Sequence, residues 1–311
     1  MRGFTNKDRM VGIDAILPEE VFQELDLQAH NAATVPVQLR SLFPDWFNHP
    51  DIGWKQEYAY DVETDMSAAK ITTLFGDLDT DNLINTRSTV KVVMIEKDFR
   101  IPRWTFENGS EDGYDVMGRN ILAAARKVGE KEDAYLIMGW PEDGTNYQIP
   151  FQGLYEQANN DYSTSKDFGT NGYPGAAVDG GIALLEADYE YGPYNLILNP
   201  VQRRELSGSM DTYGNRELPI VNDKLNSVSV GKIGPDDHET KRVFSMPAMT
   251  AGDGLMIADD PTAFAVHPAG GLSIEIYDPS TVQGKFVSGR VMRREVLTIY
   301  RTNALCKLSN I

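Results

Sequence analysis

The residues that could carry chemistry are few and lie far apart in this 311-residue chain. Its histidines, His30, His49, His238 and His267, show no spacing that would place two of them on one helix face to bind zinc. The single cysteine, Cys306, alternates with apolar neighbours, so we expect it to be buried rather than reactive. No glycine-rich phosphate loop and no G-x-S-x-G nucleophile turn occurs. The sequence therefore predicts no catalytic residue, no metal site, no cofactor and no enzymatic activity.

The acidic motifs favour ordinary surface roles. Residues 77–82 resemble the opening of an EF-hand calcium loop, but Asn82 replaces the required Gly and Ser88 replaces the required Glu. The carboxylate pairs at 236–237 and 259–260 lie in turn-like sequence, where solvated acids are the usual outcome. We therefore expect an acidic loop at residues 77–82 and no bound calcium.

Composition narrows the class of protein. The apolar fraction of 41% predicts a folded chain, whereas the net charge of −17 argues against a surface that binds phosphate backbones. Such a charge favours solubility at high ionic strength and is compatible with a halophilic source. One cysteine excludes an intramolecular disulfide. No signal peptide is visible and no apolar run is long enough to span a membrane.

The first hundred residues predict an arm followed by an extended hairpin. Prolines interrupt residues 1–54, apart from a short helix at 18–25, and the aromatic side chains there must be buried against the chain's own body or a neighbour. Two strand-like segments, Tyr58–Val62 and Val90–Glu96, then flank a long polar stretch. A connection of this length usually has a function or an external partner, so we expect a projecting hairpin.

A long helix and a compact α+β body follow. Within Trp104–Gly139, apolar residues recur at steps of three and four, which predicts a helix that bends or breaks at Gly129. A core helix of an α+β enzyme fits this segment as well as a helix that contacts neighbouring subunits. Further on, Tyr194–Leu198 predicts a buried strand, with Asn199 as N-cap and Pro200 at the first position of the next helix.

The other elements expected in the second half are one helix and several strands, and His267 is expected in a loop. They are a helix at 176–188 and strands at 254–257, 263–266, 272–277 and 286–300.

The order of these parts resembles the HK-97-type capsid fold of tailed-virus major capsid proteins, in its encapsulin-related branch. The segment Tyr58–Glu96 resembles the extended loop, and Trp104–Gly139 resembles the spine helix. The segment Ala183–Leu206 resembles part of the axial domain, and Arg293–Leu308 resembles the returning strand of the peripheral domain. The resemblance covers residues 55–311 and depends on the order of the segments rather than on one motif.

The resemblance implies an α+β fold with a defined set of parts. They are an N-terminal arm (1–54), an extended loop (55–100), a peripheral domain with the spine helix (101–182), an axial domain (183–275) and a peripheral return strand with the C-terminus (276–311). The expected inter-subunit contacts are made by aromatic residues and one lysine: Trp46, Phe47, Trp54, Tyr58, Tyr60, Lys70 and Trp104. Some relatives cross-link such a lysine to an asparagine; Lys70 and Asn310 are the pair to examine, and we expect no cross-link.

The function implied is structural. Many copies, as hexamers and pentamers, would form the icosahedral capsid of a virion, assembled in the host cytoplasm with portal, scaffold or protease proteins. The shell would enclose double-stranded DNA without sequence-specific binding and without a membrane. Two alternatives stay open at this point: an encapsulin nanocompartment that encloses a cargo enzyme, and a soluble α+β enzyme of unknown reaction.

Overall fold

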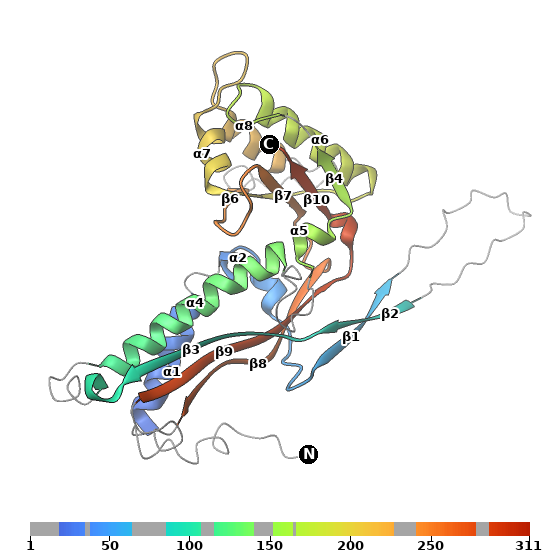
Figure 1. Cartoon of the computed structure of the whole chain (residues 1–311). Coiled ribbons are helices and arrows are strands. Elements are labelled where there is room, and N and C mark those ends of the chain that lie inside the picture. The colour runs from blue at the N-terminus through green and yellow to red at the C-terminus, as the bar shows by residue number, and fades with distance from the viewer. Residues whose placement is uncertain are drawn as a thin grey trace, which may run out of the picture.

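The computed structural model describes residues 19–34, 38–63, 85–106, 115–139, 152–163, 166–226, 241–277 and 286–311. Figure 1 shows a lower part, built from helices that lie along a three-stranded sheet, and an upper part, built around a five-stranded sheet. A two-stranded ribbon leaves the body to one side. The predicted α+β class is confirmed, with helices and sheets in both parts.

The three-stranded sheet is antiparallel, in the order β3 (Val93–Pro102), β9 (Phe286–Ile299) and β8 (Phe264–Tyr277). In β3 the apolar residues Ile95, Phe99 and Ile101 are buried while their neighbours are largely exposed. This alternation places one face of β3 toward helix α4, whereas the central strand β9 is buried along most of its length on both faces. The three-stranded sheet is therefore the surface on which helix α4 packs.

Helix α4 packs on this sheet, and helix α1 packs on α4. Helix α4 (Val116–Met138) begins at Asp115, whose carboxylate accepts the Gly118 N–H at 2.7 Å, and it continues through Gly129 without a break. Helix α1 (Glu19–Thr34) packs on α4 with Leu25 and residues one and two turns later. A Cβ atom at Gly118 would lie 2.9 Å from Leu25 Cδ2, so glycine permits this close approach. The predicted short helix at 18–25 is thus the start of a longer one.

The five-stranded sheet forms the core of the upper part. Its order is β4 (Asn160–Ser163), β10 (Leu305–Ser309), β7 (Asp253–Ala258), β5 (Tyr194–Leu198) and β6 (Val243–Ser245). Every residue of β5 is buried. The helices of this part are α5 (Leu154–Gln157), α6 (Tyr173–Ala187), α7 (Pro200–Gly208) and α8 (Glu217–Asn226). Such full burial explains why β5 is apolar at every position except Asn195 and does not alternate.

The remaining elements are short or lie at the edges of the two parts. They are α2 (Gln38–Leu42), the 3-10 turns η2 (Pro44–Phe47) and η4 (Thr302–Ala304), and the ribbon strands β1 (Glu57–Glu63) and β2 (Asn85–Lys91).

Local predictions in the second half hold with one correction. Asn199 caps α7 by accepting the Val201 N–H at 2.9 Å, as predicted. The two strands expected at 263–266 and 272–277 are one strand, β8, which continues across a bulge between Pro268 and Gly271. His267 therefore lies in a strand and is buried, not in a loop.

Strand pairing divides the chain differently from the predicted domain ranges. The predicted axial range, 183–275, contains most of β8, which pairs with β9 in the three-stranded sheet. The predicted return segment, 276–311, contains β10, which pairs with β4 and β7 in the five-stranded sheet. Partners distant in the chain decide which sheet a strand joins, and the local pattern does not reveal them. The named domains themselves stay a prediction.

Candidate assembly site

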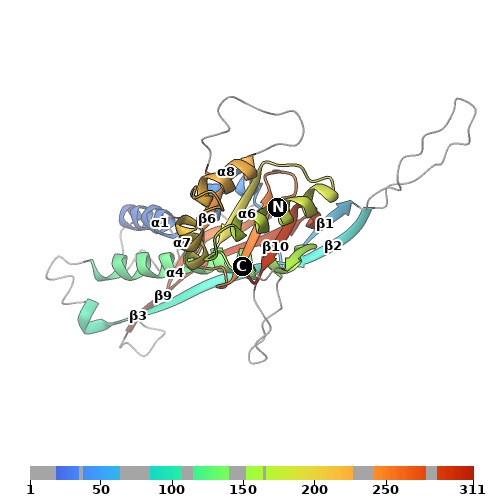
Figure 2. The ribbon, with the colours of Figure 1, turned by 90° about the horizontal axis from the view of Figure 1, so that it is seen from above.

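The ribbon of β1 and β2 is the part of the described chain that stands away from the body, as Figures 1 and 2 show from two directions. Its strands are antiparallel, with Tyr58 opposite Val90 and Tyr60 opposite Ser88. These four residues share one face and are half-buried, whereas Lys91 belongs to the opposite face and is exposed. A two-stranded sheet is marginally stable in water by itself, so this face requires another surface.

The root of the ribbon packs on a cluster of rings. The Tyr58 ring lies 4.7 Å from the His267 ring, and the Tyr60 ring meets Tyr300 edge-on at 5.7 Å. The His49 ring lies 4.8 Å from His267 on another side. Burial, and to a lesser extent His49, lowers the pKa of His267 to about 4. The root is thus held by ring contacts in a buried site that favours the neutral form of His267.

The segment before the ribbon, residues 38–53, lies across the body and is called the strap below. At its far end the Ile52 N–H donates to the Pro268 carbonyl oxygen at 2.9 Å. The Asp51 carboxylate accepts the Gly53 N–H at 2.7 Å and the Gly270 N–H at 2.9 Å. These bonds fasten the strap to the bulge of β8. The bulge gives the ribbon a fixed starting point.

The strap buries one of its predicted contact residues within its own chain. Trp46 is 2% exposed; its ring stacks on Phe43 at 3.9 Å and meets Phe264 of β8 at 4.9 Å. The prediction left two surfaces open for this side chain, and in the structure it packs on the chain's own body. Phe47 is half-buried beneath the Arg40 guanidinium, 4.3 Å from its ring centroid.

Two other predicted contact residues are exposed, and one lies outside the described part. Trp54 is 53% exposed, with the Arg294 guanidinium 3.5 Å from its ring. Gly270 of the bulge has a φ of 101°, a backbone conformation that other residues rarely adopt. A Cβ atom at this position would also lie only 3.2 Å from Trp54 Nε1, so the close approach of the tryptophan favours glycine as well. Trp104 follows β3 and is 67% exposed. Lys70 lies outside the described residues.

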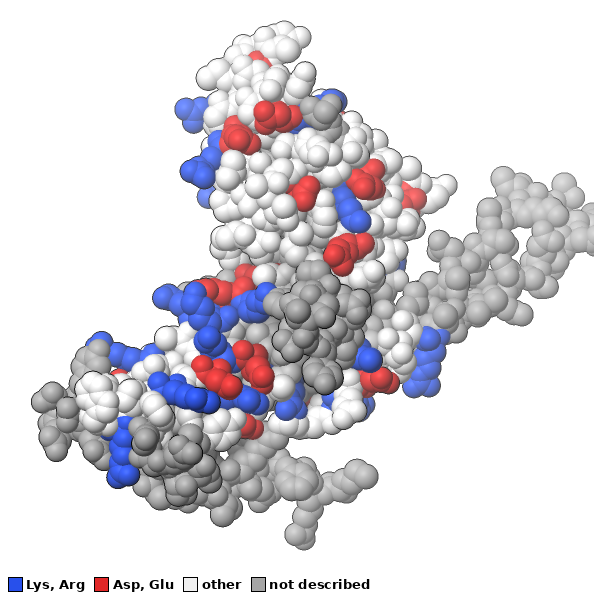
Figure 3. All heavy atoms as spheres, viewed as in Figure 1, with Lys and Arg blue, Asp and Glu red and all other residues white. Residues whose placement is uncertain are grey.

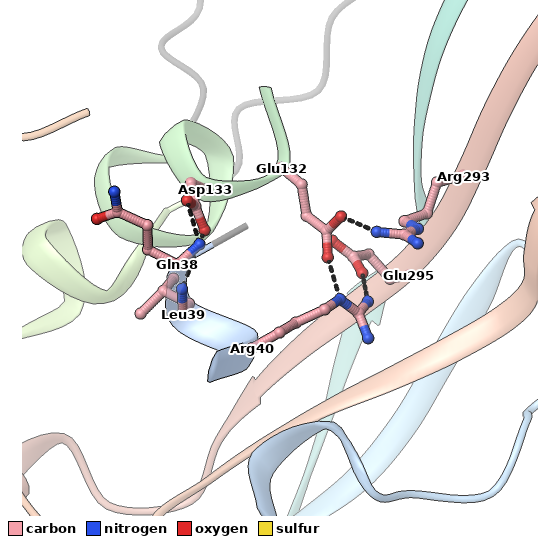
Figure 4. Close-up of polar contacts among 7 residues, drawn as sticks. All are labelled: Gln38, Leu39, Arg40, Glu132, Asp133, Arg293 and Glu295. Carbon is pink, nitrogen blue, oxygen red and sulfur yellow. Dashed lines mark hydrogen bonds and ion pairs between the residues drawn. The ribbon is translucent and has the colours of Figure 1, made fainter. Parts of the chain in front are cut away.

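A buried ion network ties the strap to the spine helix and the sheet (Figure 4). The Arg40 guanidinium donates to Glu132 of α4 at 2.8 Å and to Glu295 of β9 at 3.1 Å. Arg293 of β9 donates to the other oxygen of Glu132. Both glutamates are fully buried. Charges so deeply buried are tolerated because each is paired.

The adjacent carboxylate, Asp133, caps the first turn of α2. It accepts the Gln38 N–H at 2.8 Å and the Leu39 N–H at 3.3 Å (Figure 4). Burial raises the pKa of Asp133 to about 6, although both N–H groups act in the opposite direction. Burial and the nearby Glu132 raise the pKa of Glu295 well above its ordinary range. Glu132 pairs with both arginines, one through each of its carboxylate oxygens.

Sequence reasoning missed this network and the histidine cluster. Arg40 lies 92 residues from Glu132 and 255 from Glu295, so no local pattern connects them. The local sequence gave no signal either, because Glu132 and Asp133 follow exposed charged residues of the same helix: Arg126, Lys127, Glu130 and Lys131. The described residues contain no group of three or more His, Cys, Asp or Glu side chains placed to hold a metal ion.

The charges on the surface are mixed. Figure 3 shows Lys and Arg more frequent on the lower part of the visible face, where α1 and α4 lie in Figure 1, with acidic side chains between them. The exposed basic residues of α4 are Arg119, Arg126, Lys127 and Lys131. The negative net charge of the chain is therefore not spread evenly over this face. Among the helices of the described part, none has the length and apolar character needed to cross a membrane.

Solved capsid structures share this architecture. The virus-like particle from Pyrococcus furiosus matches with a TM-score of 0.59 and 14% identity, over 93% of this chain and 100% of that chain. The capsid of Myoviridae phage XM1 matches with a TM-score of 0.65 and 10% identity, over 88% and 92%. The capsid of the empty GTA particle matches with a TM-score of 0.61 and 13% identity, over 88% and 89%. The chain therefore has the HK-97-like capsid fold.

The family follows from the sequence itself. Residues 63–228, more than half of the chain, match the family model described as encapsulating protein for peroxidase. The chain belongs to this family. No curated protein sequence matches it.

Proposed function

We propose that the chain is the subunit of a closed icosahedral shell, and that the ribbon joins each subunit to its neighbour. The observation that carries this proposal is that the two faces of the ribbon differ: one face bears the half-buried tyrosines and the other is more polar. Its tyrosine face is held by the body at the root, through Tyr58 and Tyr60, while the strands extend away from the rest of the described chain. A second copy of the chain is the surface that would complete it. Family and structural neighbours are shell proteins, which also supports a structural role.

Salt should strengthen such a shell. Each copy carries a net charge of −17, so neighbouring copies repel one another at long range. The Debye length falls to about 3 Å at about 1 M salt, which removes this repulsion but leaves ring packing intact. Assembly that improves with salt would therefore indicate contacts that are mainly apolar.

Our first candidate for the contents is double-stranded DNA, with the chain as the major capsid protein of a tailed virus. Capsids of phages and of the GTA particle are among the structures with this fold. The acidic chain would hold the genome by confinement rather than by binding it. Portal, scaffold or protease proteins would act during assembly, in the cytoplasm of the host.

A second candidate is a nanocompartment that encloses an enzyme. The match to the family described as encapsulating protein for peroxidase favours it. Particles purified from the natural source distinguish the two: nuclease-protected DNA would support the capsid, and a co-purifying enzyme without DNA would support the nanocompartment.

Sedimentation of the purified chain in low and in molar salt, with electron microscopy of any fast fraction, tests the proposal. We expect closed particles whose yield rises with salt. Replacing residues 65–88 by a short glycine linker should leave folded subunits, judged by circular dichroism, that form no stable shell. Intact particles from that variant would contradict the role given to the ribbon.

A further inference from the structure

We propose that the strap, residues 38–53, is held by two clamps that respond to protons in opposite directions. Acid would release the strap at its histidine end, beneath the ribbon, while its α2 end stays bound. The clamps belong to one chain, so the inference does not depend on whether copies assemble. Their positions at the two ends of one segment make the response local.

The histidine clamp is built from neutral rings. His267 is 5% exposed, and the groups that face it are His49 from the strap, Tyr58 from β1 and Tyr300 after β9. None of these three carries a negative charge. Among the described residues, His267 Nδ1 and His49 Nε2 are buried without a hydrogen-bond partner. A proton added to His267 would therefore create a buried cation with no counter-charge among these neighbours.

The carboxylate clamp is built for the opposite response. Asp133 holds the first two amides of α2, and the groups that face it are Arg40 from the strap and Glu132 from its own helix. Glu295 faces Glu132, Arg40 and Arg293, with Tyr135 of α4 nearby. Asp133 is 7% exposed and lies beside Glu132, so a proton on Asp133 removes a buried negative charge next to another carboxyl group, and this outweighs the opposite effect of the two amide bonds.

The direction of each response follows from proton linkage. The pKa of His267 falls from an ordinary 6.5 to about 4, so its contribution is present above pH 6.5 and is lost as the pH falls toward 4. The pKa of Asp133 rises from 3.8 to about 6, so its contribution is present below pH 3.8 and is lost as the pH rises through 6. Between these values, acid weakens one clamp and strengthens the other.

Hydrogen exchange of the intact chain, followed by mass spectrometry and corrected for the intrinsic effect of pH, tests this. If each opened end titrates normally, lowering the pH from about 7.5 to about 5 multiplies the opening constant at the histidine end by roughly thirty. The same change divides the opening constant at the α2 end by roughly ten. Peptides covering 47–53 and 38–43 report the two ends, through the Ile52 amide and the Leu39 amide.

The variant His267→Gln keeps a polar side chain that does not titrate, and its 47–53 peptide should lose the acid response. The control, His30→Gln, changes an exposed histidine of α1 and should keep it. Should the first variant fail to fold, His49→Gln replaces it, with a reduced response expected because a neighbour that lowers the pKa of His267 is gone. An acid response that persists undiminished in the His267 or His49 variant, or equal opening of both peptides in the wild type, would overturn the proposal.

Discussion

The strap and the ribbon are consecutive segments with similar aromatic content, yet they are stabilised in different ways. The strap buries Leu39, Phe43 and Trp46 within the chain and pairs its charges there. The ribbon half-buries Tyr58 and Tyr60 at its root and then leaves the body. The difference teaches that an aromatic segment outside the two main sheets can bury its rings on its own body, as the strap does, or leave part of them for another surface, which we propose is a second copy. Three substitutions sharpen or break this contrast.

The largest effect is expected from Trp46→Ala. Emptying a buried tryptophan site costs about 3–5 kcal/mol in the free energy of unfolding, because contacts with Phe43 and Phe264 are lost. Trp54→Ala is the matched control, since its exposed ring loses chiefly the Arg294 contact, worth about 0.5–1 kcal/mol. Chemical denaturation of dissociated subunits measures both. Equal losses would mean that the strap is not packed as described.

A smaller loss, about 3 kcal/mol, is expected from Glu132→Gln. This variant leaves Arg40 and Arg293 buried without a carboxylate that pairs with both. Glu295→Gln, its control, removes a carboxylate that pairs with Arg40 and whose pKa is already raised by burial and by Glu132, so the cost should stay within about 1 kcal/mol. The same denaturation experiment compares them. If the two variants cost the same, Glu132 is not the carboxylate on which both arginines depend.

The smallest effect on the subunit is expected from Tyr60→Ala, below about 1 kcal/mol, because the side chain is only half-buried. Its effect on assembly should be large if the tyrosine face meets a second copy. Thr89→Ala, on the opposite face of the ribbon, serves as the control. Sedimentation measures the particle yield of each variant. A similar loss of particles from both variants would contradict a contact made by the tyrosine face alone.

Sequence patterns predicted correctly those elements that depend only on residues close together in the chain. The cap at Asn199 and the proline after it lie within two residues of each other, and the apolar step of α4 is visible in any window of its sequence. The structure also explains why Gly129 does not break α4: Gly129 is buried within the packed helix, and packing outweighs the low helix propensity of glycine.

Long-range pairing set the limits of prediction. Nothing near Cys306 indicates that its strand pairs with both β4 and β7, and nothing near Glu132 indicates two arginines from distant segments. Trp46 and Trp54 likewise have similar sequence surroundings, whereas their exposure differs more than tenfold. Which aromatic side chain finds a surface on its own chain depends on the tertiary fold, and helix or strand periodicity carries no information about it.

The position of β10 between β4 and β7 has a consequence for how the protein is made. Residues 305–309 are synthesised more than a hundred residues after β4. During that time β4 and β7 lack the strand that pairs with both of them. Until that strand arrives, the upper part keeps an open sheet edge, whereas α1 can pack on α4 much earlier. The five-stranded sheet can therefore be completed only after residue 309 has been synthesised.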